Sequence, residues 1–310
     1  MDVQPLSIII IILFVLSFLG LMKIYSYISK GVKYVDNIQI NDDLILALDN
    51  YVNKIRSHET KIKLQTKKTL TKEEVLKEYL SSIKNFTYSE KQNLNYLIND
   101  VENSVEKYKK FRNQFEWNLV KLDNKIEWGM PFTLGNYIFL PEHVLKLSNT
   151  QLKSTLLHEQ VHILQRRHQD RFNFLYERIL GFKKINYCDL GDHLDKYRIS
   201  NPDGMDVNWV FKVGLHWIMP MIIMEPNNNN NHDEYGVLVN IKNDGYHSVN
   251  YMGSNNEPVM VPLRNLHEYC KKLKRNNGIY HPNEYLAHSI EDAIYKNNKH
   301  GELLLRLFFN

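Results

Sequence analysis

The pattern of hydrophobic and polar positions divides the chain into three long stretches behind a short tail, residues 1–5. Residues 6–28 are predominantly hydrophobic, with one charged residue, Lys23. Residues 29–120 place hydrophobic side chains three or four positions apart with charged residues between them, the spacing of amphipathic helices. Residues 121–310 alternate short strand-like and helical segments. The pattern therefore predicts a membrane segment, a helical region and an α+β domain.

Residues 6–28 are long enough to cross a bilayer as a helix, which needs about 20 apolar residues. A cleaved signal peptide is the alternative, but no Lys or Arg precedes the run and no small-x-small site follows it. We therefore expect an uncleaved, single-pass anchor with the lipid bilayer as a partner. Because Lys23, Lys30 and Lys33 lie at its C-terminal side, the positive-inside rule predicts that the bulk of the chain is cytoplasmic.

Capping signals mark helix starts within residues 29–120. Thr71 with Glu74, and Ser89 with Gln92, have the spacing of capping boxes. The hydrophobic positions around them predict two or three antiparallel helices. We interpret this region as a membrane-proximal helical support, with a regulatory or inhibitory segment as the alternative.

In residues 121–310 the hydrophobic runs predict an α+β fold with a small mixed or antiparallel sheet. The predicted strands are Ile126–Trp128, Tyr137–Leu140, Val207–Val213, Trp217–Met224, Tyr235–Ile241 and His247–Tyr251. The predicted helices are Leu152–Gln165, Asp170–Leu180, Leu266–Leu273 and a last one that begins at Pro282. Ser148 and Gln151 have capping-box spacing before the first helix, and Gly181 ends the second. The apolar tail, Leu303–Phe309, is expected to dock on the core.

Composition narrows the class of protein. Of the 310 residues, 43% are hydrophobic and 24% are charged, values typical of a folded chain. The 39 basic and 35 acidic residues leave a net charge of +4, which is too balanced to indicate nucleic acid as a partner. The 2 cysteines, Cys188 and Cys270, make no disulfide framework or CxxC zinc site. We expect free thiols in a reducing compartment rather than a single bridge.

The candidate chemistry centres on residues 158–162, His-Glu-Gln-Val-His, an H-E-x-x-H motif inside the first predicted helix of this domain. Residues four apart share a helix face, so the imidazoles of His158 and His162 can bind one metal ion. The carboxylate of Glu159 can reach a water on that ion and take its proton. Two histidines on an ordinary helix are the alternative. The capped helix and the hydrophobic residues around the motif favour a partly buried zinc site.

A catalytic zinc ion usually has three protein ligands, so one ligand must come from elsewhere in the chain. Glu284 is the best candidate because it lies in the first turn of the helix that begins at Pro282, which can face the first helix across a cleft. The alternative is that this carboxylate only complements the helix dipole.

These motifs resemble those of the gluzincins, the thermolysin-like zinc peptidases. In that group an HExxH motif is followed by an Asn-Glu pair at the start of a later helix. In this chain the pair is residues 283–284, about 120 residues after the motif. The segment Tyr137–Pro141, the Asn-Pro-Asp-Gly stretch at residues 201–204 and the H-P-x-E-x-x-A stretch are also similar to short bacterial and viral members of the clan. The resemblance covers residues 126–295.

By this resemblance the chain would bind one zinc ion through His158, His162 and Glu284, with Glu159 as the general base. The family usually carries an acid four residues after the third ligand, where it accepts a hydrogen bond from a ligand histidine. This chain has His288 at that position.

A histidine is a poorer hydrogen-bond acceptor than a carboxylate in this role. Three alternatives stay open. Glu291 or Asp292 serves in its place, the site is detuned, or His288 is itself a metal ligand.

Other side chains could assist peptide hydrolysis, in which a zinc-activated water attacks a carbonyl carbon and the oxyanion needs a donor. Candidate donors by residue type and position, each with a packing or surface role as its alternative, are Tyr280, His281, Tyr246 and His247. An extended peptide often pairs with an edge strand. Residues 136–140 are the candidate edge, unless they lie in the core. We interpret Asp203 as a turn former.

Three functions are compatible with these features. The first is a membrane-anchored zinc peptidase that hydrolyses a protein or peptide substrate. The second is a catalytically inactive, metallopeptidase-like membrane scaffold, which the His at position 288 favours. A zinc hydrolase acting on a non-peptide amide is the third. The intact general base, Glu159, favours an enzyme.

Overall fold

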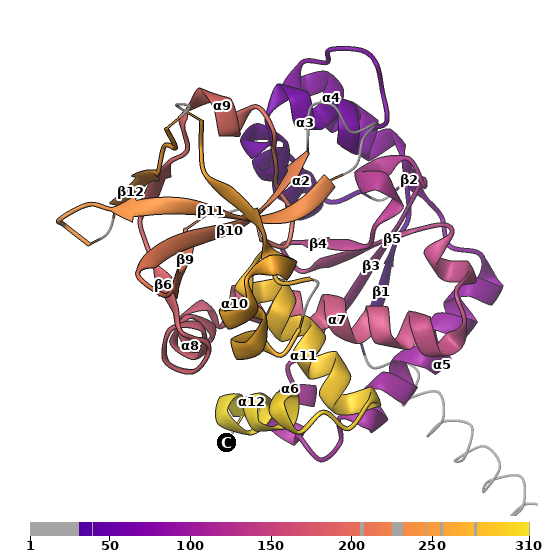
Figure 1. Ribbon diagram of the computed structural model, residues 1–310. Coiled ribbons are helices and arrows are strands. Elements are labelled where there is room, and N and C mark those ends of the chain that lie inside the picture. The colour runs from indigo at the N-terminus through magenta and orange to yellow at the C-terminus, as the bar shows by residue number, and fades with distance from the viewer. Residues whose placement is uncertain are drawn as a thin grey trace, which may run out of the picture.

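In the computed structural model the chain has mixed α and β structure with two separate sheets (Figure 1). The structure describes residues 31–38, 40–204, 208–224, 232–245, 247–254, 257–275 and 278–309. The sequence predicted one small sheet beside the metal helix. The described residues form a five-stranded sheet and an eight-stranded one, so the β content is larger than expected.

The first sheet has the order β1-β3-β5-β4, and β2 pairs with the end of β3. Its strands are β1 (Val32–Val35), β2 (Ile83–Lys84), β3 (Trp117–Leu122), β4 (Phe132–Leu134) and β5 (Tyr137–Pro141). The pairs β1–β3 and β3–β5 are parallel, whereas β4 runs antiparallel to β5. The predicted strand at Tyr137–Leu140 is therefore confirmed, and it lies inside the sheet.

Helices cover both faces of this sheet (Figure 1). They are α2 (Asp42–Lys54), α3 (Ser57–Lys63), α4 (Lys72–Ser81), α5 (Tyr88–Ser104), α6 (Lys109–Arg112) and α7 (Asn149–Arg167). Alternate residues of β3 point to opposite faces: Leu119 packs with α5 and α7, and Val120 packs with α2 and α4. The boundary expected after residue 120 falls inside β3. The helical region and the following domain therefore share one sheet and its core.

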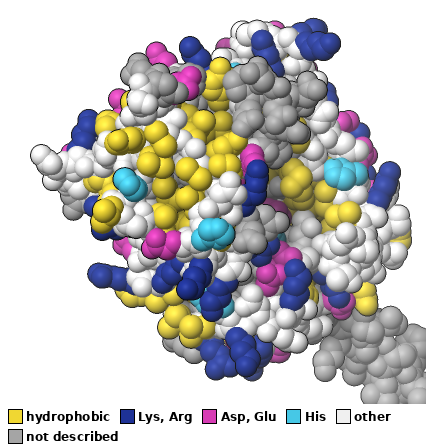
Figure 2. All heavy atoms as spheres, in the orientation of Figure 1, with side chains coloured by type: hydrophobic (Ala, Val, Ile, Leu, Met, Phe, Trp, Pro, Cys, Tyr) yellow, Lys and Arg dark blue, Asp and Glu magenta, His cyan; other side chains and the backbone are white. Residues whose placement is uncertain are grey.

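The second sheet has the order β6-β9-β10-β11-β12-β7, with β13 on β11 and β8 on β10. Its strands are β6 (Phe182–Lys184), β7 (Tyr187–Asp189), β8 (Arg198–Ile199), β9 (Trp209–Val213), β10 (His216–Met224), β11 (His232–Ile241), β12 (His247–Asn250) and β13 (Met260–Pro262). These strands confirm the four predicted after residue 207, within a residue or three at each end. Figure 2 shows hydrophobic side chains gathered over this sheet.

Most of the remaining helices lie below the two sheets in Figure 1 and contribute to the main core, whereas one short helix lies at the top of the view and packs on the second sheet. They are α8 (Gln169–Leu175), α9 (Gly191–Asp195), α10 (His267–Leu273), α11 (Pro282–Tyr295) and α12 (Lys299–Phe309). A π-helical turn, Tyr176–Leu180, continues α8 and ends at Gly181, whose φ of +85° is the left-handed conformation that glycine favours. The docking predicted for the C-terminal tail is confirmed, since Leu304 and Leu305 are buried in the main core.

Two local predictions are wrong. Residues Ile126–Gly129 form a 3₁₀ turn rather than a strand, with Glu127 and Trp128 in the left-handed region. The capping box of α5 uses Thr87 and Glu90 instead of Ser89 and Gln92. The box at Thr71 and Glu74 is confirmed.

The proposed anchor, residues 6–28, and the tail before it lie outside the described residues. Within the part of the chain that is described, every helix is too short or too polar to cross a membrane.

Candidate metal centre

The H-E-x-x-H motif lies in the middle of α7. The Ser148 hydroxyl accepts a hydrogen bond from the Gln151 amide, and the Gln151 side chain accepts one from the Ser148 amide, so the predicted capping box is confirmed. The helix runs between the first sheet and α11, and its motif residues are enclosed there: Glu159 is 4% exposed and His162 is 1% exposed. The predicted partly buried helix is therefore present.

The third expected ligand comes from the first turn of α11, which packs against α7. Pro282 occupies the start of α11, where its missing N–H costs no helical hydrogen bond. The ring Nδ1 of His281 accepts a hydrogen bond of 3.1 Å from the Asn283 amide and so caps the helix. This start places the carboxylate of Glu284 against the imidazoles of α7, which the sequence could only suggest.

The three expected ligands meet at nearly equal distances. Nε2 of His158 lies 3.0 Å from Nε2 of His162. The two oxygens of Glu284 lie 3.3 Å from Nε2 of His158 and 3.4 Å from Nε2 of His162. Tetrahedral zinc with bonds of about 2.0–2.1 Å places neighbouring ligand atoms about 3.3–3.4 Å apart. The carboxylate separations match this spacing, and the separation of the imidazoles is somewhat shorter.

Glu159 lies beside this group with an unused oxygen. Its Oε2 is buried and has no hydrogen-bond partner among the described residues. Ligand atoms of Glu159, His162 and Asp203 lie within 4.8 Å of one another, so Asp203 also reaches the centre. Burial raises the pKa of Glu159 well above its usual value, and the nearby charge of Asp203 raises it further. A buried carboxylate without a partner is costly, and a bound cation or water would remove that cost.

Both imidazoles have outer partners that orient them. Nδ1 of His162 lies 2.8 Å from Oε1 of Gln165, and Gln165 donates to the carbonyl of Asn283, the residue before Glu284. Nδ1 of His158 lies 3.5 Å from Oε2 of Glu291. Such partners fix the orientation of ligand histidines and leave Nε2 for a metal.

Of the alternatives for the acid missing at position 288, the geometry favours Glu291, because its carboxylate contacts His158. It accepts a hydrogen bond of 2.5 Å from Ser154, and its Oε2 lies 3.3 Å from Nδ1 of His288. Asp292, the other acid considered, instead pairs with Arg275 and Lys296. The position of the carboxylate, seven residues after Glu284, follows from two helical turns along α11.

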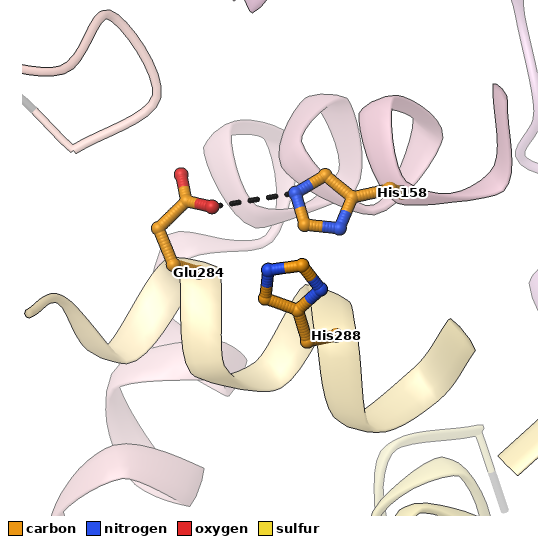
Figure 3. A group of neighbouring side chains, drawn as sticks. All are labelled: His158, Glu284 and His288. Carbon is orange, nitrogen blue, oxygen red and sulfur yellow. Dashed lines mark ion pairs between the residues drawn. The ribbon is translucent and has the colours of Figure 1, made fainter. Parts of the chain in front are cut away.

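His288 lies directly against the ligand group (Figure 3). Its ring centroid is 4.5 Å from that of His158, and ring and carboxylate atoms of His158, Glu284 and His288 lie within 4.8 Å of one another. The contact permits His288 to be a fourth ligand as well as a neighbour of the site. Its hydrogen bond to Glu291 gives it a second role, because the same carboxylate then contacts two imidazoles.

Charges at the centre are strongly coupled. Burial alone would lower the pKa of His158, but hydrogen bonds to Glu284 and Glu291 raise this pKa well above its usual value. Burial lowers the pKa of His162. Burial would raise the pKa of Glu284, yet the two adjacent imidazoles bring it far below its usual range. The imidazoles therefore stabilise the negative charge of Glu284, and the carboxylates of Glu284 and Glu291 stabilise a positive charge on His158.

The candidate oxyanion donors have different surroundings. The hydroxyl of Tyr280 accepts a hydrogen bond from the side-chain amide of Asn201, which also donates to Glu284 at 2.9 Å. Burial and the charge of Glu284 raise the pKa of Tyr280 well above its usual value, so this hydroxyl stays protonated. His281 packs on Gly204 and caps α11. Of the other two candidates, Tyr246 and the side chain of His247 lie outside the described residues.

The edge of the first sheet next to the centre is β4, because residues 137–139 of the candidate edge pair with β3 on one side and with β4 on the other. The middle residue of β4, Thr133, already has hydrogen-bond partners. Its amide donates a hydrogen bond of 3.0 Å to Asp203, and its hydroxyl donates to the same carboxylate. Arg166 donates to its carbonyl at 2.6 Å and pairs with Asp203 at 3.0 Å. Asp203 is thus a turn residue, as expected, and also a buried bridge between β4 and α7.

A cavity of about 280 Å³ lies beside the centre, between α2, the C-terminal turns of α7 and α8. Gln165, Arg166, Pro202 and Asp203 are among the residues that line it. Since Gln165 and Asp203 also contact the ligand group, a molecule in this cavity would be one side chain away from His162.

The donor set fits zinc, because two imidazoles and a carboxylate with oriented rings are usual for catalytic zinc sites. Residues that local sequence patterns did not indicate are Asn201, Gln165 and, as a buried acid, Asp203. Their contacts depend on segments far apart in the chain. Comparisons with protein-family models, with curated proteins and with solved structures find no match for this chain.

Proposed function

We propose that the chain is a zinc-dependent peptidase whose zinc ligands are His158, His162 and Glu284. One observation carries this proposal: the three side chains converge from two helices with ligand separations of 3.0, 3.3 and 3.4 Å. An open fourth position for water distinguishes a catalytic site from a structural one. In this proposal His288 is a neighbour of the site and not a ligand, which would leave that position for water.

Zinc, when bound, acidifies a coordinated water and polarises a carbonyl oxygen. Glu159 holds the proton taken from the attacking water on its unpartnered Oε2 and later gives it to the leaving amine. A cation bound at the centre would lower the pKa of Glu159, which burial raises, toward the range of a general base. Tyr280, which shares the side-chain amide of Asn201 with Glu284 through two hydrogen bonds, is the donor best supported for the oxyanion.

The gluzincin resemblance supports the same assignment and a zincin-like fold for residues 121–310. Because β1 and β2 pair with β3, the proposed domain would begin before residue 121. The proposed membrane anchor, residues 6–28, would tether the peptidase to a bilayer with its bulk in the cytoplasm. That placement rests on the hydrophobic run and its flanking lysines alone.

A catalytically inactive scaffold with a structural metal is the second candidate. The burial of the centre favours it, since Glu159, His162 and Glu284 are each less than a tenth exposed. The Asn201–Gly204 turn contacts Glu284 and β4 at the centre, so it would restrict the access of a peptide to a metal bound there. A fourth ligand from His288 would close the site completely.

Metal analysis and peptide cleavage of the full chain distinguish these functions. The expected result is a single zinc ion per chain, lost in His162→Ala and retained in Glu159→Gln. A peptide library followed by mass spectrometry should show cleavage by the wild type, decreased roughly 10²–10⁴-fold in Glu159→Gln. Zinc-loaded wild type that cleaves no peptide would support the scaffold, and a protein without zinc would refute both.

A further inference from the structure

A buried ion pair lies in the helical region near the centre. Nζ of Lys63, at the end of α3, lies 2.6 Å from Oε2 of Glu127, and these residues are 1% and 3% exposed. The hydroxyls of Tyr51 and Tyr79 donate to the other oxygen of Glu127. The ammonium also lies 5.6 Å from the centre of the Tyr51 ring. The carboxylate therefore accepts three hydrogen bonds inside the core.

Stability alone is a poor explanation for this pair. Removing two charges from water is costly, and hydrophobic residues in their place are often as stabilising. The backbone adds to the cost, because Glu127 and Trp128 have φ values of +47° and +57°. Left-handed residues other than glycine are energetically unfavourable and concentrate where a structure needs a fixed geometry. The pair is therefore expected to position something.

A further hydrogen bond of Lys63 shows which segment the ion pair holds in place. Nζ of Lys63 donates a hydrogen bond of 2.7 Å to the carbonyl of Ser200. Glu59, fully buried one turn earlier in α3, accepts hydrogen bonds from the hydroxyl and the amide of the same residue. His58 lies 3.0 Å from the carbonyl of Arg198. Three side chains of α3 thus bind the backbone that leads into the Asn201–Gly204 turn.

That turn contacts the metal centre directly. The side-chain amide of Asn201 donates a hydrogen bond of 2.9 Å to Oε1 of Glu284, and its oxygen accepts a hydrogen bond of 2.9 Å from the amide of Asp203. The carbonyl of Asp203 accepts a hydrogen bond of 2.7 Å from the side-chain amide of Asn283. A displacement of Ser200 would therefore move the amide that orients the third ligand. Ser200, which binds Lys63, and Asn201, which binds Glu284, are adjacent in the chain and separated by one peptide unit.

We propose that Lys63 is a positioning residue for the metal centre: it fixes the Ser200–Gly204 turn, whose Asn201 amide orients the carboxylate of Glu284. The inference rests on the proposed zinc site for its second step only. It assigns the helical region a part in the chemistry, beyond its role as a support. An event that shifts α3 would change zinc affinity at the centre.

The chain offers a matched control. Lys121 is 6% exposed and pairs with Glu90 at 2.9 Å on the other side of the first sheet, with no contact to the Ser200–Gly204 turn among the described interactions. The double variants Lys63→Met/Glu127→Gln and Lys121→Met/Glu90→Gln each remove a Lys–Glu pair without leaving a charge unpaired. Both are compared with the full-length wild type after circular dichroism has shown that they are folded.

Three measurements distinguish a displaced turn from a general loss of stability. Hydrogen exchange at the Ser200, Asp203 and Gly204 amides should become about tenfold faster or more in the Lys63 variant alone. Its zinc Kd, from competition with a chelator, should rise about tenfold, as for other residues that orient a ligand. The visible absorption of the cobalt-substituted protein should also change, because it reports the geometry of coordination.

The outcomes are distinguishable. Equal exchange and equal Kd in the two folded double variants would overturn the inference. Faster exchange with an unchanged Kd and cobalt spectrum would overturn the link from the turn to Glu284. A wild type without zinc would refute the proposed function, and exchange would still decide whether Lys63 fixes the turn. If the Lys63 variant does not fold, Ser200→Ala, which removes the hydrogen bond from the Ser200 hydroxyl to Glu59, tests the attachment of the same turn to α3 and has the same expected direction.

Discussion

Nδ1 of His158 lies 3.5 Å from Oε2 of Glu291, a carboxylate two turns beyond Glu284 on α11. This pair supplies the histidine–carboxylate contact that the sequence places in doubt by having His288 where an acid is usual. The Ser154 hydroxyl and His288 also contact Glu291. Burial would raise the pKa of Glu291, but hydrogen bonds from these groups and from His158 bring it far below its usual range. The carboxylate is therefore ionised and able to orient His158.

Replacing Glu291 with Gln is expected to weaken zinc binding by roughly 10- to 100-fold, because the charged partner of a ligand histidine is lost. Asp292→Asn is the matched control, since Asp292 pairs with Arg275 and Lys296 and not with a ligand. Competition with a chelator gives Kd for both variants. If the two substitutions change Kd equally, Glu291 has no special part in the centre.

Replacing His288 with Ala tests the number of ligands. The proposed site needs His158, His162 and Glu284 only, so His288→Ala should keep a single zinc ion per chain and change Kd less than about tenfold. His162→Ala should abolish stoichiometric zinc. Metal content after dialysis measures both. Loss of zinc in His288→Ala would make His288 a ligand and would favour the closed, structural site.

The sequence predicts those parts of the site that depend on local spacing. The imidazoles of His158 and His162 share a face because they are four residues apart, and the capping box at Ser148 fixes where α7 begins. Pro282 similarly sets the first turn of α11, which carries Glu284. These features need no knowledge of the rest of the chain.

The parts that the sequence does not predict depend on long-range contacts. Glu127 was expected in a strand, yet its carboxylate is bound by Tyr51, Tyr79 and Lys63, and the backbone adopts a left-handed turn to place it there. Asp203 forms the expected turn, but its burial requires the amide of Thr133 and the guanidinium of Arg166. Neither partner is near in sequence, so local patterns contain no signal for it.

The C-terminal helix should be sensitive to a single methyl group. A Cβ on Gly301 of α12 would lie 1.9 Å from the carbonyl oxygen of Ser289 and 2.8 Å from Cβ of Ala293, both on α11. Gly301→Ala must therefore separate α12 from α11, at a cost of roughly 1–3 kcal/mol or more in the free energy of unfolding. Urea denaturation measures this cost. Lys299→Ala, at an exposed position of the same helix, is the control and should change stability by less than about 0.5 kcal/mol.

The thiol of Cys188 should be unreactive in the native protein. Both cysteines are free and buried, and burial raises the pKa of Cys188 to about 11. Only the thiolate reacts with iodoacetamide, so at pH 8 this pKa alone makes alkylation roughly two hundredfold slower than for a thiol of pKa 8.5. Mass spectrometry of native and urea-unfolded protein gives the two rates. Rapid native labelling of Cys188 would contradict its burial behind the second sheet.

The same pKa predicts how stability depends on pH. Above about pH 8.5 the thiol of the unfolded chain loses its proton, whereas the folded chain keeps the proton on Cys188 until about pH 11. The folded state then binds more protons, so the contribution of Cys188 to the free energy of unfolding is fully present below pH 8.5 and is lost as pH rises toward 11. Cys188→Ala should remove this part of the decline. Urea denaturation at pH 7.5 and at pH 10 tests it, and an identical decline in wild type and variant would refute the raised pKa.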